Sequence, residues 1–161
     1  TFQAVSSLYP EFVHKFKKGS INLVEIKITP KIKIYSVEEK RTSEFLDRHK
    51  NLSLIQDDIK NVNYPYFILL LFGSYAKNSA QEKSDIDLCL ISDNKEKSKE
   101  LLSKLELLSL PLEAHEFTTK EFESMLNKKE NNLAKEIIKY NLILFGIENY
   151  YNLVSKWMKK E

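Results

Sequence analysis

The stretch Tyr66-Phe-Ile-Leu-Leu-Leu-Phe-Gly-Ser74 decides the fold of this chain. Its continuous apolar run is typical of a β-strand covered on both faces, and the Gly-Ser pair ends that run abruptly. A short polar stretch then leads to Ser84-Asp-Ile-Asp-Leu-Cys-Leu-Ile91, which predicts a second strand. Asp85 and Asp87 are two residues apart in it, so both carboxylates point to the same face, whereas Ile86 and its alternate neighbours point to a core.

The segments that follow predict one more strand and several helices. Lys95–Leu108 carries leucines at helical spacing, and Leu112–Phe117 has the length of a short strand. Thr118 has the character of a helix N-cap. Helical spacing returns over Leu133–Phe145 and Ile147–Met158, which Gly146 divides.

The first sixty residues have a different pattern. Thr1–Lys18 shows helical spacing interrupted at Pro10, and Ile21–Tyr35 alternates around Pro30, which predicts one or two short strands. Val37–His49 and Leu52–Val62 predict helices. We therefore expect an N-terminal appendage of short strands and helices over residues 1–60 and a main domain, with C-terminal helices, over residues 61–161.

Composition excludes several classes of protein. The 161 residues carry Lys+Arg 25 against Asp+Glu 23, a formal net charge of +2, so no large basic field indicates a nucleic-acid binder. Cys89 stands alone and forms no internal disulfide. The longest apolar run, Phe67–Phe72, is too short to span a membrane. We expect a cytoplasmic protein without a membrane partner. Because Thr1 opens the chain without a methionine, we also expect a fragment or processed product.

Asp85 and Asp87 form a candidate metal site. Carboxylates side by side repel each other, and a divalent cation such as Mg²⁺ or Mn²⁺ relieves that repulsion. Upstream, Gly73-Ser74 offers backbone N–H groups and a hydroxyl to a phosphate where a helix begins. Ten residues separate Ser74 from Asp85. A phosphate cradle beside a carboxylate pair supplies the two parts that phosphoryl or nucleotidyl transfer needs.

The motif Phe72-Gly-Ser-Tyr-Ala-Lys77, followed by Lys83-Ser-Asp-Ile-Asp-Leu88, resembles the minimal nucleotidyltransferases of the DNA polymerase β-like superfamily. The resemblance implies a mixed α+β fold, with a small mixed sheet, helices packed on one face and C-terminal helices. It implies Mg²⁺ or Mn²⁺ bound by Asp85 and Asp87, and an NTP, with ATP favoured. The residues that it assigns to the nucleotide are Gly73, Ser74, Lys77 and Ser84.

The same resemblance implies an activity, the transfer of an NMP, with AMP favoured, to a hydroxyl acceptor that can belong to a partner protein. Asn78 stands where the family has glycine, and asparagine tolerates a positive φ better than most residues. The alternative function is a nucleotide-binding regulatory module of a DNA-binding or toxin–antitoxin-type protein. Ile28–Lys31 resembles a segment of domains attached to a winged-helix module, so partners include a small helical protein and, through a missing N-terminal region, nucleic acid.

A third functional group is expected in Leu112–Phe117. Strand alternation turns Leu112 and its apolar neighbour toward the core and leaves Glu113 and His115 on the face of the aspartates. Glu113 is the first candidate for a third metal ligand or general base. Counting back from Thr118, the acid position of the family falls on His115, and a shift of one residue would select Glu116. The absence of a third group would favour binding without transfer.

Overall fold

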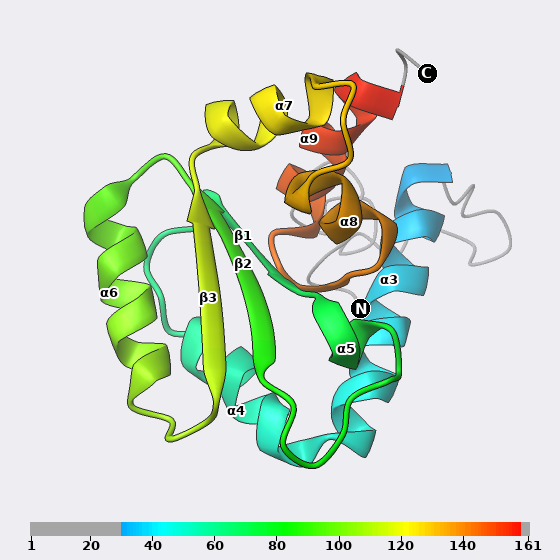
Figure 1. Cartoon of the computed structure of the whole chain (residues 1–161). Helices are drawn as coiled ribbons and strands as arrows, with labels where there is room; N and C mark the ends of the chain where they lie inside the picture. The colour runs from blue at the N-terminus through cyan, green and yellow to red at the C-terminus, as the bar shows by residue number, and fades with distance from the viewer. Residues whose placement is uncertain (1–29, 159–161) are drawn as a thin grey trace, which may run out of the picture. The chain divides into compact units, whose positions relative to one another are not determined.

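The computed structural model describes residues 30–158, shown in colour in Figure 1. The chain divides into two compact units, Thr1–Lys33 and Ile34–Glu161, and the description below concerns the second. The expected N-terminal helix over Thr1–Lys18 lies outside the described residues. Within residues 30–158, no helix is long and apolar enough to cross a membrane.

Four strands and seven helices make up the described part of the chain. The strands are β1 (Phe67–Leu71), β2 (Ile86–Ser92), β3 (Leu112–Phe117) and β4 (Leu142–Phe145). The helices are α3 (Pro30–Arg48), α4 (Lys50–Ile59), α5 (Gly73–Ala76), α6 (Lys95–Glu106), α7 (Thr119–Asn127), α8 (Leu133–Lys139) and α9 (Ile147–Met158).

The strands form one mixed sheet in the order β3-β2-β1-β4. β1 runs antiparallel to both β2 and β4, whereas β2 and β3 are parallel and are joined through α6. Parallel strands need a longer crossover connection, usually a helix, because a tight turn makes the next strand antiparallel. The sheet confirms the mixed α+β class predicted from the sequence.

Helices cover both faces of this sheet: one face carries α3, α4 and α6, and the expected C-terminal helices lie on the other. Leu69 and Leu71 of β1 pack on one side with residues of α3, α4 and α6. Ile68 and Leu70 pack on the other side with residues of α7, α8 and α9. Both faces are covered because both faces of β2 are apolar. On the face of Asp87, the strand continues with Cys89 and Ile91, which are buried by the C-terminal helices.

Helix α4 belongs with the sheet. Leu52, Ile55 and Ile59 of α4 are fully buried in the core that contains Leu69 and Leu88. The compact unit accordingly begins at Ile34, whereas the sequence pattern placed the boundary between residues 60 and 61.

Two expected elements are wrong. The strands expected over Ile21–Tyr35 are replaced, where the structure describes them, by the first turns of α3, because proline is well tolerated at a helix start; residues 21–29 lie outside the described range. The helix expected over Leu133–Phe145 ends at Lys139, and its last four residues form β4. Asn141 contributes to that end, since its side-chain amide donates to the Ile137 carbonyl at 2.8 Å.

Candidate active site

The strands bring three of the predicted site residues, Asp87, Glu113 and His115, together on one face of the sheet. The backbone N–H of Phe72 donates to the Asp87 carbonyl at 3.0 Å, and Asp87 pairs with Glu113 across the parallel β2–β3 ladder. Directly paired residues on neighbouring strands present their side chains to the same face, about 5 Å apart. His115, two residues beyond Glu113, shares that face.

Asp87, Glu113 and His115 form a cluster of potential ligands. One ligand atom of each lies within 4.8 Å of those of the other two. The imidazole Nε2 of His115 is 3.5 Å from the Glu113 carboxylate, and the ring of Phe72 contacts the His115 ring at 5.6 Å between centroids. Asp87 and His115 are half-buried and Glu113 is exposed. Two carboxylates and an imidazole are a donor set that fits a divalent cation.

This cluster shows where the candidates for the third group lie. Glu113 and His115, weighed there as alternatives, both lie beside Asp87. Glu116 pairs with Leu90 and therefore points to the opposite face. Strand alternation in the sequence already predicts both side chains on the face of the aspartates, but it does not show which of them lies opposite Asp87.

The surroundings of Asp87 concentrate negative charge. Burial raises the pKa of the Asp87 carboxyl above its ordinary value, and the negative charges of Glu113 and Asp85 raise this pKa further. His115 and the backbone N–H of Ser74, which donates to the carboxylate, act in the opposite direction. The deprotonated carboxylate is thus destabilised in the metal-free protein, as expected where a cation belongs.

Asp85 lies at the edge of this cluster. It is exposed and precedes the first residue of β2, and it lies outside the cluster of ligand atoms formed by Asp87, Glu113 and His115. It is nevertheless near enough for its charge to raise the pKa of Asp87. The role of Asp85 as a metal ligand remains a prediction.

The Gly-Ser turn lies against Asp87. Gly73 opens α5 with a φ of +68°, a conformation that favours glycine. A Cβ on Gly73 would overlap the Asp87 carboxylate, so the backbone here approaches the acid more closely than any other residue permits. The expected phosphate cradle and the acid cluster are therefore neighbours.

The loop after α5 carries the remaining predicted residues. Asn78 has a φ of +54°, which confirms that asparagine supports the positive φ expected there. Lys77 is exposed, with its ammonium 5.8 Å from the centre of the Tyr140 ring. The Ser84 hydroxyl accepts from the Gln81 backbone N–H at 2.8 Å, which shapes the loop that leads to Asp85. Nucleotide contacts by Lys77 and Ser84 remain predictions.

Comparisons with known proteins show the family of the chain. The family model described as polymerase beta, nucleotidyltransferase matches residues 53–149. A Methanocaldococcus jannaschii protein that carries the provisional name protein adenylyltransferase is 32% identical over 100 residues, which cover 59% of this chain and 72% of the relative. A solved structure, described as a toxin–antitoxin with AMP-PNP, is similar at 19% identity and a TM-score of 0.43, covering 65% of this chain and 85% of that one.

The class that the family match defines is an enzyme of the nucleotidyltransferase type. Because the family model matches more than half of the residues, the chain belongs to the polymerase beta nucleotidyltransferase family. The motifs around Gly73 and Asp87 lie inside the matched range.

Replacing Gly73 with alanine is expected to damage both the fold and the site. Alanine at a positive φ is strained, and its Cβ would push the Asp87 carboxylate aside. We expect a loss of about 1–3 kcal/mol in the free energy of unfolding and a marked loss of nucleotide affinity. Urea unfolding and a nucleotide titration measure the two effects. Unchanged stability together with unchanged affinity would contradict the close approach of Gly73 to Asp87.

Replacing Asp87 with asparagine is expected to stabilise the metal-free protein at neutral pH. The folded state raises the pKa of Asp87, so the charged carboxylate opposes folding above that raised pKa, and the opposition is relieved as the pH falls toward the ordinary aspartate pKa of about 3.9. The gain in melting temperature of Asp87→Asn over the unmodified protein should therefore be present near pH 7 and disappear below about pH 4. Melting curves in a chelator across this pH range measure it. A variant less stable than the parent at pH 7 would contradict the argument.

Proposed function

We propose that this chain transfers AMP from ATP to a hydroxyl group of an acceptor protein. The observation that carries the proposal is the convergence of the Gly73-Ser74 turn, at the start of α5, with the acid cluster of Asp87, Glu113 and His115. Positioning and charge neutralisation are most of what phosphoryl-group transfer requires, and the closeness of the Gly-Ser turn to the acid cluster supports both. The protein acceptor is supported by the name of the M. jannaschii relative.

Each residue has a place in this proposal. The backbone N–H of Gly73 and the hydroxyl of Ser74 bind phosphate oxygens at the start of α5, while the Ser74 backbone N–H holds the Asp87 carboxylate. Asp85 and Asp87 would hold Mg²⁺, and the bound cation would supply charge neutralisation for the phosphates. Lys77, at the end of α5, adds a positive charge for the phosphate chain.

The transfer needs only ATP, the acceptor hydroxyl and a group that accepts its proton. The acceptor hydroxyl oxygen bonds to the α-phosphorus, and the bond from that phosphorus to the bridging oxygen of the β-phosphate breaks. Pyrophosphate leaves with the electron pair of the broken bond. Glu113, the most exposed carboxylate of the cluster, accepts the hydroxyl proton, which suits a group in contact with solvent and acceptor.

Thermal unfolding with ATP tests the nucleotide part of the proposal without knowledge of the acceptor. ATP at one hundred times its Kd, with Mg²⁺, should stabilise the native state by about 2.7 kcal/mol. The stabilisation should need Mg²⁺ and disappear in the variant that combines Asp85→Asn with Asp87→Asn. Asp57→Asn, an equal change on the exposed surface of α4, is the matched control and should keep it. No stabilisation by millimolar ATP would refute the proposal.

A further inference from the structure

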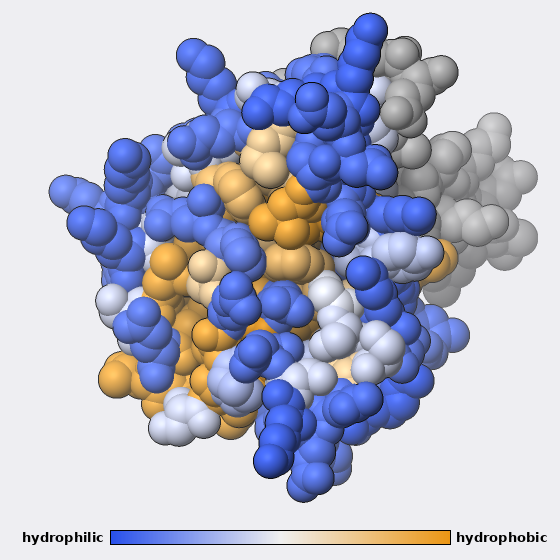
Figure 2. Space-filling view, in the orientation of Figure 1, coloured by the Kyte–Doolittle hydropathy of each residue, from blue (hydrophilic) through white to orange (hydrophobic). Residues whose placement is uncertain are grey.

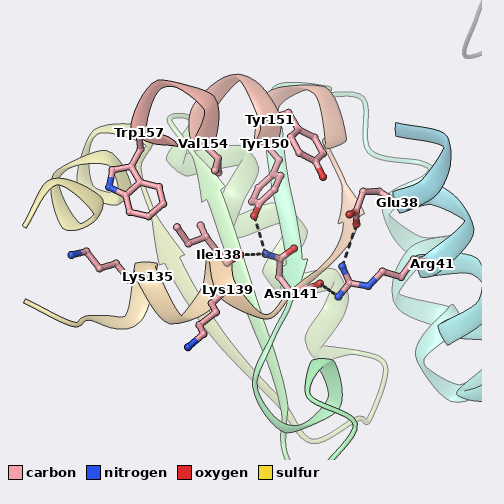
Figure 3. Close-up of a pocket in the computed structure, with 10 residues that line it drawn as sticks. All are labelled: Glu38, Arg41, Lys135, Ile138, Lys139, Asn141, Tyr150, Tyr151, Val154 and Trp157. Carbon is pink, nitrogen blue, oxygen red and sulfur yellow. Dashed lines mark hydrogen bonds and ion pairs between the residues drawn. The ribbon is translucent and has the colours of Figure 1, made fainter. Parts of the chain in front are cut away.

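A cavity of about 440 Å³ lies between α3, α8 and α9, outside the acid cluster (Figure 3). Its volume falls in the range of small-molecule sites, about 300–1,000 Å³. Its lining joins the aromatic rings of Tyr150, Tyr151 and Trp157 of α9 to Lys135 and Lys139 of α8 and to the Glu38–Arg41 ion pair of α3. Flat rings beside positive charges suit a planar ligand that bears negative charge.

Asn141 supplies a polar group at the inner end of this cavity. It is 7% exposed, and its side-chain nitrogen donates to the Ile137 carbonyl and to the Tyr150 hydroxyl, each at 2.8 Å (Figure 3). These bonds use the amide hydrogens and fix the orientation of the amide. Among the residues that the structure describes, no hydrogen bond is made to its Oδ1. The cavity therefore offers a fixed acceptor to a ligand that carries an N–H group.

Asn141 lies in the same row of the sheet as the acid cluster. Leu142 pairs with Leu71, so the register continued by one residue places Asn141 beside Phe72. Phe72 is in turn bonded to Asp87. With strands about 4.8 Å apart, Asn141 is two strands and roughly 10 Å from Asp87 on the same face. One nucleotide is long enough to extend from the acid cluster to the cavity.

Two lysines lie between the acid cluster and the cavity. The ammonium groups of Lys77 and Lys139 lie 5.8 Å and 5.5 Å from the centre of the Tyr140 ring. Lys77 ends the helix that begins with the Gly-Ser turn, and Lys139 lines the cavity. A phosphate chain held at α5 would thus have compensating charge on the side that faces the cavity.

We propose that this cavity binds the base of the nucleotide substrate, an adenine ring whose exocyclic amine donates to Oδ1 of Asn141. The inference rests on the proposed function and adds the place where the adenine base binds and the residue that selects it. Guanine and uracil carry a carbonyl oxygen where adenine and cytosine carry the amine, and two acceptors facing each other leave both unsatisfied. The three aromatic rings of α9 favour the larger ring of adenine over cytosine.

Trp157 is the single tryptophan of the chain and reports directly on the cavity. ATP titrated with Mg²⁺ should change its fluorescence and saturate at one nucleotide per chain. Tripolyphosphate, which has no base, should compete with ATP and leave the fluorescence unchanged. The concentration for half-saturation should be at least about 10-fold higher for GTP than for ATP, since one hydrogen bond is lost and an acceptor is left unpaired.

Two variants separate the cavity from the fold. Asn141→Leu removes the acceptor but also removes the bond that satisfies the end of α8. Ile138→Phe enlarges a half-buried lining residue and leaves that bond in place. Both variants should lower the affinity for ATP about 10-fold or more and leave the affinity for tripolyphosphate unchanged. Leu54→Phe, an equal enlargement at an exposed position of α4, should change neither.

The outcomes distinguish this inference from the function on which it rests. ATP binding that needs Asp87 but leaves Trp157 fluorescence and the Ile138→Phe affinity unaffected would overturn the base site and leave the proposed function standing. Two nucleotides per chain, with a Trp157 response that survives Asp87→Asn and ignores tripolyphosphate, would make the cavity a separate site and overturn the inference. Absence of any ATP binding would overturn both.

Discussion

Asp87→Asn is expected to lower the rate of nucleotidyl transfer at least about 10³-fold. The substitution keeps the size of the side chain but removes the charge at the centre of the acid cluster, and interactions with a metal-bound phosphate are worth several kcal/mol. About 4 kcal/mol of lost transition-state stabilisation corresponds to this factor. Release of pyrophosphate from ATP, measured with acceptor present, gives the rate.

The control for this rate is Asp57→Asn. Asp57 lies on the exposed surface of α4, where it pairs with Lys60. The Asp57→Asn variant loses the same charge there, and its rate of nucleotidyl transfer should equal that of the unmodified chain. The Asp87 variant should remain folded, as its melting curve will show. A folded Asp87→Asn protein with more than a tenth of the original rate would remove Asp87 from the catalytic machinery.

The second large effect concerns the core, where Leu70→Ala is expected to cost about 2–5 kcal/mol of unfolding free energy. Leu70 is 0% exposed and packs in the core under α7, α8 and α9. The loss is a large share of the roughly 5–15 kcal/mol that stabilises a domain. Urea unfolding followed by circular dichroism measures the shift in midpoint.

Leu107→Ala is the matched comparison for the core variant. Leu107 is 82% exposed just after α6, so the same truncation should change the free energy of unfolding by no more than about 0.5 kcal/mol. Equal losses for the two variants would show that the burial of Leu70 does not control stability. Exposed apolar residues are not rare in this protein: Figure 2 shows apolar surface among the polar side chains of the visible face.

The parts of the fold predicted from sequence are those that local pattern determines. The apolar run of β1, the alternation of β2 and the Gly73-Ser74 turn are each legible within about ten residues. The same holds for the direction of the Asp87 side chain, which follows from strand alternation alone. These features placed the candidate site before any tertiary contact was known.

The parts missed depend on contacts between distant segments. β4 is four residues long and forms a strand only because it pairs with β1, some seventy residues earlier, so its sequence alone continues the helical pattern of α8. Likewise, the parallel register of β2 and β3 decides that Glu113 lies opposite Asp87, and the sequence of β3 contains no information about its partner.

The cavity was hidden for the same reason. Tyr150 and Trp157 read from the sequence as aromatic residues at helical spacing, for which packing is the ordinary interpretation. They line a cavity only because α3 lies against the start of β4 and closes the space beside α9. Arg41 makes that contact by donating to the Asn141 carbonyl at 2.7 Å, across one hundred residues of sequence.

The most direct test of the account compares ATP labelled at the α-phosphate with ATP labelled at the γ-phosphate. With Mg²⁺ and cellular proteins as acceptors, label from the α-phosphate should remain on protein after denaturation, and label from the γ-phosphate should appear in pyrophosphate. Asp87→Asn should abolish the transfer. Label that reaches protein only from the γ-phosphate, or α-label transfer at an equal rate in folded Asp87→Asn, would contradict a nucleotidyl transfer centred on Asp87.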